Sequence, residues 1–123
     1  MELIRGAHNI KPHHHGSVAS VGNFDGVHLG HQAVLRQLID AAAKHQLPSL
    51  VIIFEPQPAE YFRPEGQTPR LSALREKLIL LQRFGIDRAC VLRFDEYLAA
   101  QTAEEFATNT LVKGFGIREL IVG

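Results

Sequence analysis

The sequence has little that would tie it to a membrane, to nucleic acid or to an oxidising compartment. It contains a single cysteine, Cys90, so no disulfide can form within the chain, and the apolar run around it is typical of a reduced core residue. Lysine plus arginine and aspartate plus glutamate number 13 each, which predicts no bulk attraction to nucleic acid or to a charged membrane surface. The longest apolar run, residues 50–54, is far too short to span a bilayer, and the first residues do not resemble a signal peptide. The default expectation is a cytoplasmic protein that has no nucleic acid or membrane partner; its oligomeric state is left open.

Short apolar segments alternate with segments of helical spacing, which predicts an α/β domain. The 123 residues suffice for a single domain with one core. Strands are expected at residues 18–21, 49–54, 89–92 and 117–122, and helices after His31, after Ser72 and after Thr102. Residues 3–4 form either a short edge strand or a packed arm. The strands are apolar without alternation, so they are expected to be buried on both faces of a doubly wound, Rossmann-like parallel sheet.

The residues between the first strand and the first helix predict a site for a phosphate. Gly22, Gly26 and Gly30 follow the apolar residues 18–21 and stand where the backbone must turn sharply. The helix that follows presents its free N–H groups and the positive end of its dipole to whatever lies above it. Phosphate is the most common biological anion in such a place.

Two histidines in this stretch indicate chemistry on that phosphate. His28 and His31 are three residues apart at a helix start, so they share one face, with Cβ atoms roughly 5–6 Å apart. Imidazoles donate hydrogen bonds to phosphate oxygens and stabilise charge that develops on them. The glycine spacing does not fit a dinucleotide fingerprint, no lysine provides a Walker loop, and the histidine spacing does not fit a zincin. The alternative is a pair of ordinary surface histidines beside a tight turn.

The string from Gly22 to His31, GNFDGVHLGH, resembles a known family. The HLGH portion is similar to the His-x-Gly-His signature of the nucleotidyltransferase superfamily, and the longer string resembles bacterial FAD synthetase. That family is the FMN adenylyltransferase module that is usually fused to a riboflavin kinase. The resemblance implies transfer of an adenylyl group from ATP to FMN, which gives FAD and pyrophosphate, with Mg²⁺ accompanying ATP. Alternatives are another nucleotidyltransferase of the superfamily, or a nucleotide-binding module without turnover.

The resemblance also implies roles for individual residues. His28 and His31 would be catalytic, and no protein ligand to a metal is implied. A second group would contact ATP: Gly22, Asn23, Phe24, Asp25, Gly26 and Gly30. Pro58 and Phe62, in a segment expected to form an extended loop after the second strand, would line the flavin pocket. Tyr61 in the same segment either joins that pocket or plugs the sheet edge.

Three other groups of residues receive structural interpretations. His13, His14 and His15 are expected in a solvated loop rather than at a metal ion, because no cysteine or carboxylate lies near them in the sequence. Glu76 and Lys77 are expected to form an exposed ion pair on a helix. Residues 94–97 leave the third strand at the ligand edge, where Asp95 either contacts a substrate or caps a helix, and the cap is favoured. Thr102 with Glu105 is interpreted as a capping box that opens a helix burying Phe106, Leu111 and Val112.

The resemblance extends from about residue 3 to residue 123 and covers only the front part of the family's adenylyltransferase module. Ser20 and Gln57 depart from the residues that the family often has, threonine and histidine, without breaking the motifs. In the family the final strand continues into further nucleotide-binding loops and then a kinase domain. The resemblance therefore implies a single incomplete nucleotidyltransferase domain, residues 1–123, truncated after its fourth main strand and lacking the riboflavin kinase domain. Such a fragment is expected to be inactive in isolation.

Overall fold

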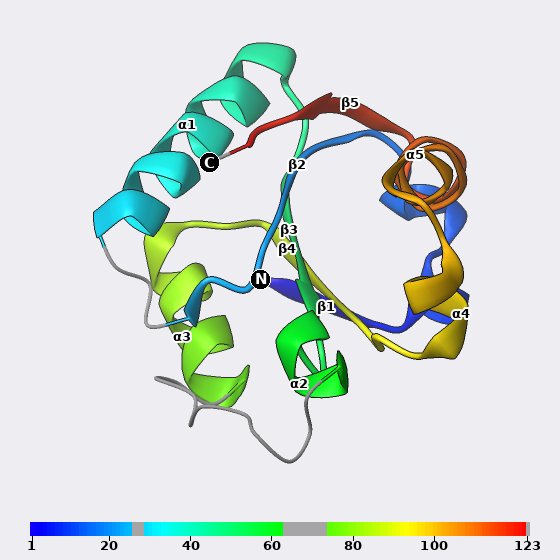
Figure 1. Cartoon of the computed structure of the whole chain (residues 1–123). Helices are drawn as coiled ribbons and strands as arrows, with labels where there is room; N and C mark the ends of the chain where they lie inside the picture. Colours follow the sequence, from blue (N-terminus) through cyan, green and yellow to red (C-terminus); the bar gives the residue numbers. More distant parts are fainter. Residues whose placement is uncertain (26–28, 63–73, 123) are drawn as a thin grey trace.

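Five parallel strands form a single sheet in the middle of the molecule (Figure 1). The computed structural model describes residues 1–25, 29–62 and 74–122, with Leu29 and Ala59 described only in their backbone. The strands are β1 (Glu2–Arg5), β2 (Ser17–Val21), β3 (Ser49–Phe54), β4 (Arg88–Leu92) and β5 (Ile117–Leu120). Their order across the sheet is β1-β4-β3-β2-β5, and every neighbouring pair is parallel.

This strand order is that of a doubly wound fold. From β2 the chain steps outward through β3 and β4, then returns to the other side of β2 for β5. The sequence prediction of a doubly wound parallel sheet is confirmed, and residues 2–5 form an edge strand beside β4 rather than an arm. In such sheets the ligand lies beyond the carboxyl ends of the strands, at the point where the winding reverses. Here that point lies between β2 and β5.

Helices cover the sheet on both faces (Figure 1). One face carries α1 (Leu29–His45) and α3 (Leu74–Phe84), while α4 (Glu96–Ala100), α5 (Ala103–Phe106) and the π-helical segment η4 (Ala107–Gly114) lie on the other. The short helix α2 (Pro58–Phe62) follows β3, and two 3₁₀ turns, η1 (Ala7–Asn9) and η2 (Pro12–His14), connect β1 to β2.

The side chains of the strands divide between two cores. Val51 and Ile53 belong to a core with residues of α1 and α3, whereas Leu50 and Ile52 belong to the core of the opposite face, with Leu111 and Phe115. This division follows from the two-residue period of a strand. Since helices cover both faces of the sheet, neither face of β3 is exposed to solvent. This explains why residues 50–54 are all apolar.

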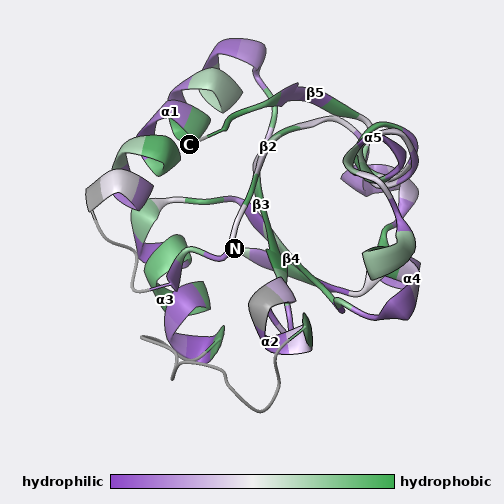
Figure 2. Ribbon diagram, in the orientation of Figure 1, coloured by the Kyte–Doolittle hydropathy of each residue, from purple (hydrophilic) through white to green (hydrophobic). Residues whose placement is uncertain are grey.

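Helix α1 stands against β2 through an apolar stripe. Leu35, Leu38 and Ala42 are spaced by three and four residues and are buried, and hydrophobic and hydrophilic residues recur along the helix in the same rhythm (Figure 2). Full burial of a leucine side chain contributes about 1.5–3 kcal/mol. The helix begins at Leu29, two residues before the predicted start, and Gln46 follows it at a φ of 55°.

Several local predictions need correction. Residues 58–62 form a helix instead of an extended loop, with Pro58 at its first position, where the missing N–H costs nothing. Val112 is 59% exposed, so it is not part of the core, whereas Leu111 is buried as expected. The last strand ends at Leu120 rather than at Val122. The expected helix cap at Ser72 lies outside the described residues.

Candidate functional site

The turn after β2 leads to the carboxyl edge of the sheet. The N–H of Gly22 donates to the carbonyl oxygen of Ile52 at 3.1 Å, so the pairing of β2 with β3 extends one residue past the strand before the chain leaves the sheet. Helix α1 begins at Leu29. A 17-residue helix therefore starts at the edge where doubly wound folds bind ligands.

The side chain of Phe24 anchors the turn in the hydrophobic core. Its side chain is buried among the residues between the sheet and α1, and its backbone has a φ of 52°. A bulky residue in this left-handed region is strained, so the burial of the ring holds a conformation that the backbone alone disfavours. A Cβ atom on Gly22 would stand 3.1 Å from the Phe24 ring, which accounts for glycine there. The side chain of Phe24 is thus occupied in the core.

His31 lies beside Phe24, in the first turn of α1. Its ring centroid is 5.2 Å from that of Phe24, and the side chain is half-buried. Gly30, just before it, is exposed, and Asn23 and Asp25 are half-buried. The other predicted members of the site, Gly26 and His28, lie outside the described residues. An imidazole at a helix start can donate a hydrogen bond to an anion that the helix N–H groups also attract.

Lys77 is a member of the site that sequence reasoning misplaced. It was expected to form an exposed ion pair with Glu76, but its side chain is 0% exposed, and its Nζ lies 3.8 Å from Oδ1 of Asp25. Glu76 is exposed. The expectation was wrong because Lys77 stands on the inward face of α3 with Leu74 and Leu81. Its spacing of three from Leu74 was the signal that could have revealed this.

Aromatic side chains gather where β3 and β4 end. Phe94 makes ring contacts with Phe54 at 5.5 Å, Tyr61 at 5.4 Å and Phe62 at 5.8 Å between centroids. Next to them lies a hollow of about 570 Å³, which falls within the size range of small-molecule pockets. It is lined by Pro56, Tyr61, Arg93, Phe94, Asp95, Glu96 and Tyr97. Phe62 stands near this hollow, packed on Phe94, and Pro58 begins the same helix.

The sequence prediction placed residues 94–97 at the ligand edge of the sheet but assigned none of them to the flavin pocket. Phe94 lies two residues after the end of β4, at the same edge as residues 55–62, and this shared edge was the available signal. Asp95 has the predicted cap role, since its Oδ1 accepts the N–H of Leu98 at 3.0 Å. A larger hollow of about 720 Å³ lies between the β1–β2 connection and η4, and the glycine-rich turn contributes none of its described lining residues.

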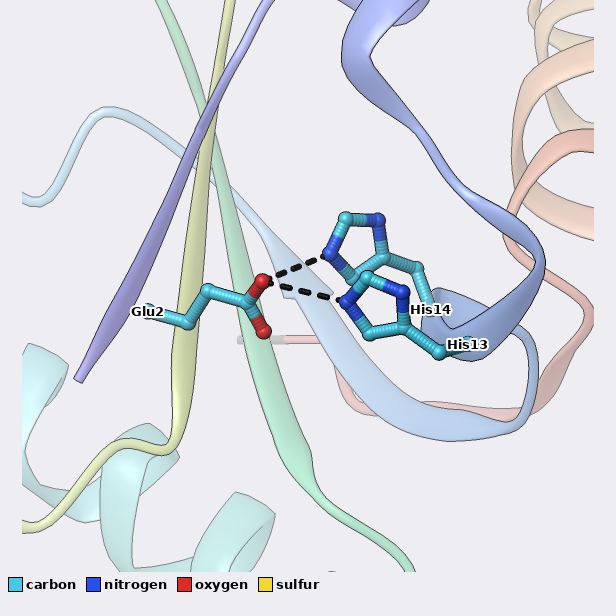
Figure 3. Close-up of side chains that lie close together, drawn as sticks. All are labelled: Glu2, His13 and His14. Carbon is cyan, nitrogen blue, oxygen red and sulfur yellow. Dashed lines mark hydrogen bonds and ion pairs between the residues drawn. The ribbon is translucent and has the colours of Figure 1, made fainter.

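A second cluster joins Glu2 to two of the three consecutive histidines (Figure 3). One oxygen of Glu2, Oε2, lies 2.8 Å from Nε2 of His14 and 3.3 Å from Nε2 of His13, and the other oxygen lies 3.2 Å from Nε of Arg88. His14 is buried, so the expectation of a solvated loop is wrong for this residue. The carboxylate that the local sequence lacked comes from β1.

The hydrogen bonds of His14 argue against a metal ion at this cluster. The backbone N–H of Lys11 donates to Nδ1 of His14 at 2.8 Å, so a neutral ring carries its proton on Nε2 and donates it to Glu2. A metal-binding histidine instead donates through the nitrogen that does not touch the metal. The hydrogen bond from His14 lowers the pKa of Glu2, against partial desolvation, with help from His13 and Arg88. The cluster therefore ties β1 to η2.

Cys90 lies in the core as expected, and burial raises the pKa of its thiol to about 12. In the part of the chain that the structure describes, no helix has the length and apolar character needed to cross a bilayer.

Comparison with known proteins identifies the family. The model of the FAD synthetase family matches residues 10–123. Bifunctional riboflavin kinase/FMN adenylyltransferases are 47% identical over 123 residues in Pseudomonas fluorescens and 45% identical over 124 residues in Escherichia coli K12. Both alignments span the whole chain but only 39% and 40% of the relatives' own lengths. A crystal structure described as a macrolide-efflux protein from Streptococcus pneumoniae matches with a TM-score of 0.81 at 29% identity, over 100% of this chain and 41% of that one. On the strength of the family match, this chain belongs to the FAD synthetase family.

Proposed function

We propose that this chain provides the site at which an adenylyl group passes from ATP to FMN. A phosphate oxygen of FMN would attack the α-phosphorus of ATP in line. The new bond joins these two atoms, the bond from the α-phosphorus to its bridging oxygen breaks, and pyrophosphate leaves. No protein nucleophile is needed, so the task of the protein is to position the two substrates and to stabilise charge.

The turn between β2 and α1 carries this proposal. It places the start of a long helix and His31 at the reversal point of the sheet, where the triphosphate of ATP would bind. Gly22, Asn23, Asp25, Gly26 and Gly30 would supply backbone contact and space, together with the backbone of Phe24. His28 and His31 would donate to phosphate oxygens. Mg²⁺ would arrive on the phosphates of ATP and neutralise part of their charge, and no side chain is assigned to it.

The aromatic hollow beside α2 is the proposed flavin side of the site. Its walls include Tyr61 and Phe94, and Phe62 packs against Phe94 at the rim. A planar isoalloxazine ring stacks well on aromatic and proline surfaces. Pro58 and Phe62 stand on the helix that follows β3, the direct neighbour of β2 in the sheet. The two substrates would therefore lie side by side along one edge. Since both substrates are intracellular metabolites, we place the proposed reaction in the cytoplasm.

Replacement of the histidines tests the proposal. In the full-length protein, His31→Ala and His28→Ala should each lower kcat for FAD formation by roughly 10²–10³-fold, the loss typical of one transition-state hydrogen-bond donor. Thermal unfolding should change little, since His31 is only half-buried. His45→Ala, at the far end of α1 and paired with Glu119, is the matched control and should keep its activity.

Two assays separate the possible outcomes. FAD formation from FMN and Mg-ATP reports turnover, and equilibrium binding of ATP reports the nucleotide site alone. Near-normal turnover in both variants, with early melting, would show that the histidines are structural. Binding of ATP by the wild type without any adenylyl transfer to FMN would point to a binding module or to another acceptor.

A further inference from the structure

Lys77 is a fully buried cation behind the glycine-rich turn. Its side chain is 0% exposed and is among the largest of the fully buried side chains in the described residues. It stands on α3, which packs on the same face of the sheet as α1. Its Nζ lies 3.8 Å from Oδ1 of Asp25, and the side chain of Asp25 is 26% exposed.

Packing does not explain a lysine at this position. The neighbouring inward positions of α3 are leucines, and Leu74, Leu78 and Leu81 all pack into the core around α1. Transfer of an ammonium group into such surroundings is unfavourable unless an opposite charge compensates it. A methionine would fill the same volume without that penalty. We therefore attribute the lysine at this position to its positive charge, which lies close to the carboxylate of Asp25.

Asp25 belongs to the part of the turn that positions His31. Its neighbour Phe24 has a φ of 52° and places its ring 5.2 Å from the ring of His31. Phe24 holds the turn from the core side, and the Lys77–Asp25 ion pair holds it from the side of α3. Two anchors from different elements fix a backbone conformation that is disfavoured by itself.

The ion pair also adjusts the charge of the turn. A carboxylate close to the triphosphate of ATP would repel it, and the charge of Lys77 compensates that of Asp25 from behind. Lys77 lies inside the protein, with its side chain 0% exposed. Its effect passes through Asp25.

We propose that Lys77 is a positioning residue, which tethers the glycine-rich turn through Asp25 and neutralises that carboxylate where the phosphates of ATP bind. This inference rests on the proposed adenylyl transfer. It predicts two separable losses when the pair is broken: weaker binding of ATP, because Asp25 repels the phosphates more strongly, and slower transfer, because the turn is held less firmly.

Two variants of the full-length protein separate these losses. Lys77→Met removes the cation and leaves Asp25 charged. It should raise KM for ATP roughly tenfold, because removing the cation takes away positive charge that offsets the repulsion between Asp25 and the phosphates. KM for FMN should stay within about twofold, since the flavin side of the site lies at the ends of β3 and β4. Lys77→Met with Asp25→Asn removes both charges, so KM for ATP should return to within about threefold of the wild type.

The double variant also tests the tether. Its kcat should remain roughly tenfold below that of the wild type, because the turn is neutral but no longer held, and small misplacements of catalytic groups are costly. Arg75→Met is the matched control, since it removes an exposed cation from the same helix by the same replacement. It should match the wild type in both constants. If Lys77→Met does not fold, the double variant decides, because it removes both charges of the ion pair.

Hydrogen exchange provides a readout that does not depend on activity. In the double variant the amides of residues 22–25 and 29–31 should exchange faster, while those of β3 and β4 keep their protection. Wild-type kcat together with wild-type exchange in the turn overturns the proposal. Faster exchange spread evenly over the sheet overturns it as well, because Lys77 would then serve only global stability. If the wild type makes no FAD, the proposed function fails, and the exchange pattern alone still decides whether Lys77 tethers the turn.

Discussion

Single polar residues fix the amino-terminal ends of three strands. The carboxylate of Asp87 accepts hydrogen bonds from the N–H of Ser49 at 2.9 Å and from its hydroxyl at 3.2 Å, and the N–H of Asp87 donates to the same hydroxyl oxygen at 2.9 Å. The backbone of Asp87 in turn accepts the N–H of Glu2. These bonds join the starts of β1, β3 and β4. Each buried polar group left without a partner would cost about 1–3 kcal/mol, so the closed set of bonds favours this one register.

The carboxylate of Glu2 should make stability depend on pH in acid. Its pKa is lowered from the ordinary value of 4.5, first by the hydrogen bond from His14. A lowered pKa in the folded state means that the contribution is fully present above pH 4.5 and is lost as the pH falls through the folded-state pKa. Glu2→Gln should therefore unfold at lower urea concentration than the wild type near neutral pH, and the gap should close as the solution is acidified.

Urea unfolding midpoints over a pH series measure this gap. Asp40→Asn, on the exposed side of α1, is the control and should run parallel to the wild type at every pH. The effect is expected to be modest because the side chain of Glu2 is 43% exposed and solvent screens the pair. A gap between Glu2→Gln and the wild type that stays constant down to the most acidic point would contradict the assigned role of the carboxylate.

Site residues could be predicted from the sequence where their role depends on neighbouring residues in the chain. The turn around Gly22 and the position of His31 follow from neighbours in the chain, because a strand, a glycine turn and a helix start are local features. The partners of Lys77 and of His14 could not be read in this way. Asp25 is distant from Lys77 in the sequence and comes close to it through the packing of α3. Glu2 is distant from His14 and comes close to it through the edge position of β1. Charge pairing of this kind depends on the tertiary structure.

Among the elements, the strands and long helices were predictable, and the short helix α2 was not. The bounds of β3 agree with the prediction, and β2 and β4 each begin one residue earlier than expected. The capping box at Thr102 is confirmed, with hydrogen bonds of 3.0 and 3.2 Å between Thr102 and Glu105. Helix α2 has five residues, too few for a hydrophobic period to show. Its proline and aromatic residues pointed to a loop, and contact with Phe94 at the sheet edge accompanies the helical form of α2. Helix α4 also has five residues, and its cap residue Asp95 was predicted correctly.

Helix α2 should influence the flavin more than the nucleotide. Phe62 at its end is 65% exposed, so Phe62→Ala removes little from the core and should shift stability by no more than about 0.5 kcal/mol. Loss of one aromatic contact to the isoalloxazine ring should raise KM for FMN roughly fivefold. KM for ATP should not change.

Steady-state kinetics in both substrates, with the full-length protein, measure this selectivity. Val112→Ala is the control, because Val112 is also an exposed apolar residue but lies on η4, on the opposite face from α1. An equal rise of both constants in Phe62→Ala would indicate a general defect of folding and would remove Phe62 from the flavin side.

On the scale of the whole molecule, the sheet ends in two edge strands of different character. β1 and β5 are the outermost strands in the described part of the chain. The edge at β1 is bound by the contacts of Glu2 to His14 and Arg88, and η1 and η2 follow it directly. β5 pairs with β2 on one side; its last residue, Leu120, is 42% exposed, and Val122, two residues beyond the strand, is 75% exposed. An unpaired edge with apolar side chains is a template for pairing between molecules.

The polypeptide of residues 1–123 should therefore self-associate through β5. Sedimentation velocity over a range of concentrations should show a weight-average coefficient that rises with concentration for the wild type. Leu120→Lys places a charge on this edge and should suppress the rise, because an edge lysine opposes strand pairing between molecules. Val112→Lys adds the same charge to an exposed apolar site on η4 and should leave the association as it is. Equal suppression by both variants would mean that net charge, rather than the β5 edge, controls association. A wild type that stays monomeric at every concentration would show that Arg118 and Glu119, the charged residues already present in β5, protect this edge sufficiently.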